Sequence, residues 1–275
     1  MLVIPTNVPS LQAQQHLSTN QKSLQSSFNK LASGYRIVSA ADDAAGLAIS
    51  ESMKSQVRSF TVAERNANDG ISMAQTAEGA LGEVHNILGR MREIAMQGSN
   101  GSVTSTDRGF LNDEYQSLKS EITRIQGSAK FNGKQLVNAT GSSVKFQVGL
   151  NNTASDQITV SFGGVSFSAV LSASSQVSGT AATNSLAALG TIDSAITKVS
   201  TARSKFGAAM NRLDVAVSNI QTMRTNISAA NSRIRDVDVA EETAKMSRNQ
   251  VLSQAGVSVL AQANQLPQIA FGLIR

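Results

Sequence analysis

Cysteine and tryptophan are both absent from the 275-residue chain, and proline and aromatic residues are scarce. The lack of cysteine excludes disulfides, zinc thiolate sites and thiol catalysis. Aromatic residues make up only 4% of the chain, which leaves few large anchors for a globular core. The 3 prolines stand near the termini, so long helices can run uninterrupted between them.

Charge is also limited: 16% of the residues are charged and the formal net charge is +5. The basic residues are scattered, without a cluster and without interleaved aromatics, so we expect solvated helix faces and no nucleic-acid partner. No apolar run approaches the length of a membrane span. The opening MLVIPTNVPS has no charged segment before a long apolar one, so it does not resemble a cleaved signal peptide, and any export would use another route.

The strongest pattern lies in residues 189–237, where a large apolar residue stands at every seventh position. These residues are Ile192, Val199, Phe206, Leu213, Ile220, Ile227 and Ile234. The positions three residues further on are small or apolar, from Ala195 to Val237. This heptad pattern predicts a long helix with one apolar seam. Such a helix cannot cover its own seam and needs long partners.

Four other stretches supply helical partners: residues 10–34, 47–97, 106–126 and 240–273. The first and last have leucine or valine at intervals of seven. We assign subunit packing to these positions: Leu17, Leu24, Leu31, Leu252, Val259, Leu266 and Leu273. Because both terminal helices have a 3.5-residue apolar repeat, we expect them to pair as an antiparallel coiled coil.

Between the helices the apolar period changes from helical to two. Val144, Phe146 and Val148 alternate with other residues, and so do Ile158, Val160 and Phe162. A third alternating run follows Gly163-Gly164. The two-residue glycine turn predicts a hairpin in which Phe162 lies opposite Val165 and Val160 opposite Phe167.

The expected fold is mainly α, a coiled-coil and helical-bundle rod formed by the two terminal segments, with a small β-hairpin region in the middle. We expect residues 1–45 and 236–275 to form a terminal coiled-coil domain. Residues 46–235 form a helical-bundle domain, with the β element at about 131–170. No outer domain is expected.

Residues suited to catalysis or metal binding are few, and we expect no enzyme activity, no cofactor and no metal. His16 and His85 are the 2 histidines, too few for a clustered site. Residues 127–134 only superficially resemble a phosphate-binding loop, since the spacing is wrong and Gln135 replaces the required hydroxyl residue. The adjacent Asp42 and Asp43 favour helix capping or ion pairing.

Four sequence segments in order along the chain closely resemble bacterial flagellin, the subunit of the flagellar filament. They are LASGYRIVSAADDAAGLAIS at 31–50, FNGKQL at 131–136, SRIRDVDVAEE at 232–242 and MSRNQVLSQAGVSVLAQANQLPQ at 246–268. The resemblance covers about residues 1–135 and 185–275. Only the hairpin and a connector lie between, so the chain resembles a minimal flagellin with the core domains alone.

The resemblance implies a structural protein that polymerises with copies of itself into the filament used for swimming. It also implies an extracellular location, reached through the flagellar type III apparatus, and three kinds of partner: an export chaperone, the filament cap and the hook-junction proteins. Two alternatives remain at this stage. The chain could be a hook–filament junction protein of the same superfamily, or a secreted monomeric adhesin or immune ligand.

A second surface is suggested by GRMREIAMQ and NDEYQ, which are similar to the flagellin surface recognised by the vertebrate Toll-like receptor for flagellin. The residues concerned are Arg90, Arg92, Glu93, Ile94, Gln97 and Glu114. The alternative interpretation is that this helix face packs subunits along the filament, and the two roles are compatible if the receptor binds the monomer.

Overall fold

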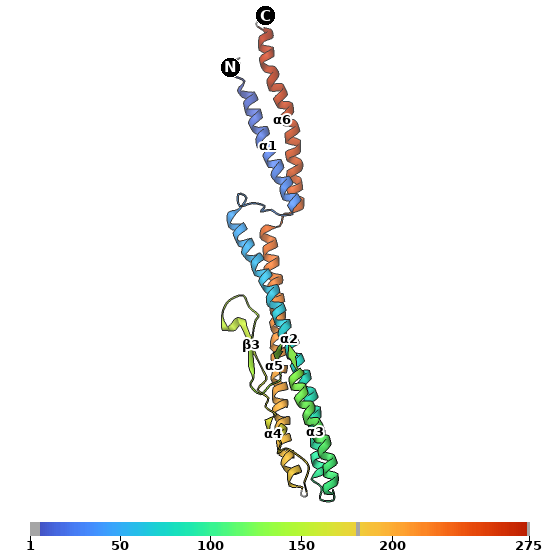
Figure 1. Ribbon diagram of the computed structural model, residues 1–275. Helices are drawn as coiled ribbons and strands as arrows, with labels where there is room; N and C mark the ends of the chain where they lie inside the picture. Colours follow the sequence, from blue (N-terminus) through green and yellow to red (C-terminus); the bar gives the residue numbers. More distant parts are fainter. Residues whose placement is uncertain (1–5, 180–181, 274–275) are drawn as a thin grey trace. The chain divides into compact units, whose positions relative to one another are not determined.

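The computed structural model describes residues 6–179 and 182–273, with residues 266–273 described by their backbone only. Figure 1 shows a chain made mainly of helices, with a small β element. The chain divides into two compact units. Unit 1 comprises 1–57 and 225–275, and unit 2 comprises 58–224. The expected mainly α fold is confirmed.

Unit 1 contains a pair of helices from the two ends of the chain, α1 (Val8–Ser33) and α6 (Val239–Leu273), which lie side by side. The Asn7 side chain accepts a hydrogen bond from the backbone of Ser10 and begins α1. Gly34, in the left-handed region at φ 74°, ends it. Asn7 contacts residue 263 and Asn20 contacts residue 249, so the helices are antiparallel, as the repeats predicted.

Two long helices, α2 (Ala44–Gly98) and α5 (Thr183–Arg235), provide most of the core of unit 2, together with α3 (Ser105–Ser128). The predicted heptad positions of α5 are buried from Ile192 to Ile220. Helix α2 has a similar ladder of apolar residues at intervals of seven, and these are buried: Phe60, Ala67, Ala74, Leu81, Leu88 and Ala95. These apolar ladders pack together because each helix alone would leave its stripe in water.

Helix α3 holds the connector that leads to α5. Arg108 and Lys119 are both buried, and each donates to backbone carbonyls: Arg108 to Gly98, Asn100 and Gly179, and Lys119 to Ser172 and Ser175. Between them, the Tyr115 hydroxyl lies 2.8 Å from Ser175 Oγ. Buried polar groups need such partners. The connector is therefore fixed to the bundle although its sequence has no periodicity.

The β element differs from the predicted hairpin. Strand β3 (Ser142–Gln147) pairs with β4 (Gln157–Phe162) in an antiparallel ladder that places Val144 opposite Val160. The residues after Gly163-Gly164 form no strand and lead to the short helix α4 (Ser168–Leu171). The remaining strands are β1 (Lys130–Phe131) and β2 (Lys134–Gln135), and residues 154–156 form a 3-10 turn.

The expected hairpin across Gly163-Gly164 is therefore wrong, and burial explains why. Phe162, Val165 and Phe167 are all buried in the same core. A chain that directs all three inward gains more apolar burial than a hairpin with one exposed face. Both glycines do have the positive φ of a tight turn, 76° and 73°. The turn was correctly located, but β4 takes its partner from the preceding run.

The unit boundaries lie inside helices. They fall at residue 57 in α2 and residue 225 in α5. Both heptad ladders run past the boundary without a change of period. A division of contacts inside a continuous helix leaves no loop or composition change in the sequence.

Candidate assembly and recognition surfaces

The seam between α1 and α6 is rich in small and polar residues. In α6 it includes four residues at intervals of seven: Glu242, Asn249, Gly256 and Ala263. Two of them, Glu242 and Ala263, are buried. Ser10 and Ser27 are buried on the α1 side, and Ser10 Oγ donates to Asn264 Oδ1 at 2.8 Å.

Specific hydrogen bonds fix the register of this seam. Asn7 Nδ2 donates to the carbonyl of Ala263 at 2.8 Å, and Asn20 Nδ2 donates to the carbonyl of Asn249 at 2.7 Å. Polar seam residues specify alignment while supplying less stabilisation than apolar ones. The register of the pair is thus set by polar contacts, while Leu17 on α1 lies against Gly256 on α6.

Several apolar side chains of the terminal helices are exposed. The predicted packing residues Leu252 and Val259 of α6 are 52% and 55% exposed, and on α1 Leu11 and Phe28 are 57% and 60% exposed. Leu17, Leu24 and Leu31 are half-buried. The side chains of Leu266 and Leu273 lie outside the described residues. The leucine–valine repeat of α6 therefore does not form the seam with α1.

A groove of about 500 Å³ lies on the α1–α6 pair. Leu24 and Phe28 from α1 and Met246 from α6 line it, together with glutamines from both helices. Phe28, which is 60% exposed, belongs both to this groove and to the exposed apolar side chains of α1. Contiguous apolar surface of this kind marks an interaction site in soluble proteins.

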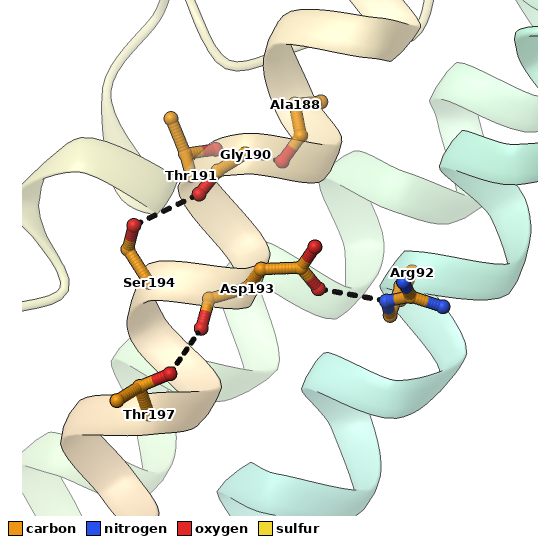
Figure 2. Close-up of polar contacts among 7 residues, drawn as sticks. All are labelled: Arg92, Ala188, Gly190, Thr191, Asp193, Ser194 and Thr197. Atoms are coloured by element: carbon orange, nitrogen blue, oxygen red, sulfur yellow. Dashed lines mark hydrogen bonds and ion pairs between the residues drawn. The ribbon is translucent and has the colours of Figure 1, made fainter.

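The second candidate surface lies on unit 2 and consists of charged side chains joined by ion pairs. Arg90 on α2 donates to Glu114 on α3 at 2.8 Å and to Glu93 at 3.0 Å. Arg92 donates to Asp193 on α5 at 2.7 Å, as Figure 2 shows. Asp193 was not among the residues predicted from the sequence, because it is distant in the chain.

The backbone around Asp193 is held by further bonds. The Thr197 hydroxyl donates to the Asp193 carbonyl and Ser194 donates to Gly190, each at 2.9 Å (Figure 2). Hydrogen bonds to the acidic partners raise the pKa of both Arg90 and Arg92. The side chains are about half exposed, so these pairs contribute little to stability and instead fix the charge pattern of the surface.

Ile94 does not belong to the exposed surface that was predicted for recognition. Its exposed fraction is 1%, and it belongs to the core of unit 2 beside Met91. Gln97 is exposed, as are Glu93 and Arg92. The heptad ladder places Ile94 on the inward face, one residue before the buried Ala95. The exposed surface therefore consists of Arg90, Arg92, Glu93, Gln97 and Glu114.

The residues considered for chemistry have structural surroundings. His16 is exposed on α1 and His85 is half-buried on α2. Asp43 accepts a hydrogen bond from the backbone of Gly46 and so caps the start of α2. Asp42 caps no helix: it accepts from the backbone of Val38 and Ser39 in the turn that precedes α2. The backbone hydrogen bond from Ser39 lowers the pKa of Asp42.

Two other kinds of site are absent from the described part of the chain. No three His, Asp or Glu side chains there are grouped so that they could hold a metal ion. None of the helices in that part is both long and apolar enough to cross a membrane.

The architecture thus defines a class: a helical structural protein whose two chain ends form one pair of helices with apolar side chains on the outside. Comparison with known proteins gives the family. Residues 4–142 match the bacterial flagellin N-terminal helical region, and residues 189–274 match the bacterial flagellin C-terminal helical region.

Full-length relatives agree. The chain is 44% identical to a flagellin of Halalkalibacterium halodurans, over 100% of both chains, and 38% identical to a flagellin of Bacillus subtilis, over 98% of both. It is 37% identical to a flagellar filament 33 kDa core protein of Treponema phagedenis, over 100% of both.

The chain belongs to the bacterial flagellin family. Its function is that of a structural subunit of the flagellar filament, as the sequence resemblance implied. The junction-protein and monomeric-adhesin alternatives are not favoured. The match along the whole length of its relatives also agrees with the minimal form expected from the short middle region.

Proposed function

We propose that this chain polymerises into the filament through the exposed apolar faces of α1 and α6. The observation that carries the proposal is the distribution of residues on this pair: Ser10, Ser27 and Glu242 are buried in the seam, while Leu252 and Val259 are exposed. Helices of a stable monomer bury their apolar stripe against each other. Here the stripe is left for other subunits.

The energetics favour assembly over the isolated monomer. Burying a large aliphatic side chain contributes roughly 1.5–3 kcal/mol. Leu252 and Val259 gain this contribution only when neighbouring copies cover them. When each copy contacts the next through different surfaces and the repeated rotation does not return to the first copy, the copies form a helical filament instead of a ring.

The test replaces the exposed apolar pair without touching the seam. We expect the Leu252→Ser, Val259→Ser variant to raise the critical concentration for seeded polymerisation by about a hundredfold, because two buried apolar contacts per subunit are lost. The control is Gln254→Ser, Gln262→Ser, which changes two exposed polar residues of the same helix.

Filament length and number are measured by negative-stain electron microscopy after addition of short seeds. Circular dichroism of the monomers verifies that both variants retain their helices. Normal filaments from the Leu252→Ser, Val259→Ser variant would refute the proposed role of this face. Loss of polymerisation in the control variant would show that the change in helix propensity, and not the lost apolar contact, is responsible.

The exposed apolar face of α6 also suggests a partner during export. An apolar stripe exposed before assembly needs cover during export, and we propose that an export chaperone binds α6 there. The chain would leave the cell through the flagellar type III apparatus without cleavage of a signal peptide, and would assemble between the hook-junction proteins and the filament cap. As a subunit of the flagellar filament, the protein is extracellular.

We also propose that the surface formed by Arg90, Arg92, Glu93, Gln97 and Glu114 binds the Toll-like receptor for flagellin. The ion pairs of Arg90 support this, because they hold a fixed charge pattern on two adjacent helices. Arg90→Ala should weaken receptor activation by the monomer at least about tenfold in a reporter-cell assay, the factor that a charge-assisted hydrogen bond represents.

The matched control for this assay is Arg124→Ala, which removes another exposed arginine that pairs with a glutamate, Glu121. Equal activation by Arg90→Ala and the unchanged chain would exclude the receptor role. Equal losses in both variants would indicate a general charge effect and would also count against it.

A further inference from the structure

A pocket of about 280 Å³ on unit 2 is not used by any of the functions above. It lies between the end of β4, the Gly163-Gly164 turn and one face of α5. The α5 residues that line it include Thr197, Lys198, Thr201 and Lys205. Their spacing places them along a single side of the helix.

The charge of this pocket is of one sign. Lys198 and Lys205 line it, and no acidic residue does. Within residues 6–179 and 182–273, neither lysine has a carboxylate partner. Other cations of α5 are paired: Arg203 with Glu78 and Arg224 with Glu64. Two unneutralised amines at one concave site favour an anion.

The two lysines are placed to hold a ligand from both sides. They stand seven residues apart, which along an α-helix is about 10 Å. Between them lies Thr201, and the hydroxyls of Thr197 and Ser161 also line the pocket. The Thr197 and Thr201 hydroxyls already donate to the carbonyls of Asp193 and Thr197, so their oxygens remain as acceptors for the hydroxyls of a ligand. The lining therefore combines cationic groups with partners for the hydroxyls of a ligand.

The floor of the pocket is rigid. Phe206 is buried and stacks on Phe162 with ring centroids 5.5 Å apart. The turn is also constrained, since a Cβ at Gly163 would meet the Asn138 side-chain oxygen at 2.1 Å. A pocket with a fixed floor loses little conformational entropy when a ligand binds.

We propose that this pocket binds a small polyhydroxylated anion of the size of one acidic monosaccharide. Its carboxylate lies between the amines of Lys198 and Lys205, and its hydroxyls bond to Thr197, Thr201 and Ser161. This binding function is separate from polymerisation and needs neither the terminal helices nor a second copy of the chain.

The test titrates glucuronate into the ¹⁵N-labelled full-length monomer and follows the amide resonances by NMR. We expect saturable shifts at Gly163, Gly164 and residues 197–206. Glucose, which lacks the carboxylate, and acetate, which lacks the hydroxyls, should each bind at least about tenfold more weakly, the factor that 1.4 kcal/mol represents. Binding of either compound as tightly as glucuronate would overturn the proposal.

Two double variants complete the experiment. Lys198→Gln, Lys205→Gln should raise the Kd for glucuronate at least about tenfold. Lys130→Gln, Lys134→Gln makes the same change of charge on the β1–β2 pair, outside the pocket, and should leave the Kd unchanged. Equal effects of both variants would reveal non-specific attraction and refute the site.

A final arm separates a free ligand from a carboxylate of a neighbouring copy. The same resonances are followed on dilution of the monomer without any added sugar. Shifts that depend on protein concentration, together with no response to glucuronate, would show that the pocket serves contacts between copies and would overturn the small-molecule proposal. Shifts with glucuronate that are independent of protein concentration support it.

Discussion

Two helical glycines, Gly98 and Gly256, differ in the space available for an added side chain. A Cβ added at Gly256 would lie 3.4 Å from Leu17 Cδ1, an ordinary contact across the α1–α6 seam. A Cβ at Gly98 would lie 2.3 Å from Val177 Cγ1 and 2.8 Å from Ser185 Oγ, which is a clash. The same substitution should therefore have opposite effects on stability.

We expect Gly256→Ala to stabilise the α1–α6 pair by roughly 0.5–1 kcal/mol, because alanine loses less backbone entropy in a helix. Gly98→Ala should destabilise unit 2 by roughly 1–3 kcal/mol, because Val177 and Ser185 are both buried and must move. Urea unfolding followed by circular dichroism measures both. Stabilisation by Gly98→Ala would show that the connector is not held tightly against α2.

The buried Tyr115 should make the stability of unit 2 depend on pH. Burial raises the pKa of its hydroxyl, and the hydrogen bond with Ser175 only partly opposes this. A group whose pKa is raised on folding contributes stability that is fully present below its unfolded pKa of about 10 and is lost as the pH rises through the folded value. Unit 2 should therefore lose stability above pH of about 10.

The measurement uses the Tyr35→Phe background, in which Tyr115 is the remaining tyrosine of the 2 in the chain. Its ionisation, followed by ultraviolet absorbance, should have a midpoint above the usual value of 10.0. The Tyr115→Phe variant should lose less stability at alkaline pH than the protein that keeps Tyr115. Both proteins contain the nearby Lys119, so the difference between their stability curves reports on Tyr115. A midpoint at or below the usual value would contradict the prediction.

At the scale of elements, the helices could be predicted from the sequence because their signal is repeated many times. The α5 ladder from Ile192 to Ile220 is buried as expected, and Gly34 ends α1 as expected. The hairpin could not be predicted, because the runs before and after β4 alternate equally well. Only the shared core decides that Val165 packs inward and Val144 pairs with Val160.

The two surfaces show the same division between what a sequence reveals and what it does not. The apolar repeat of α6 could be seen in the sequence, but which face of α6 contacts α1 could not. The residues of the contacting face, Glu242, Asn249 and Gly256, are polar or small and therefore give no hydrophobic pattern. For the charged surface, the pattern identified Arg90 and Arg92. Their partner Asp193 is brought near only by the packing of α5 beside α2.

At the scale of the whole molecule, the two units differ in how much of their stability is internal. Unit 2 has a large apolar core, whereas the α1–α6 seam buries serines, an alanine and a glutamate. Local opening requires least free energy where few apolar contacts are buried. We therefore expect the amides of α1 and α6 to exchange rapidly with solvent deuterium in the monomer.

Polymerisation should change this pattern selectively. Once neighbours cover Leu252 and Val259, the opening of α6 exposes apolar surface, so its amides should become protected in the filament by a factor of at least about ten, which corresponds to 1.4 kcal/mol. Amides of α3 and the buried part of α5 should be protected in both states. Hydrogen–deuterium exchange with mass spectrometry compares monomer and seeded filament directly. Slow exchange of α6 in the monomer would mean that the polar seam alone stabilises the pair, and that folding of the chain ends precedes assembly instead of accompanying it.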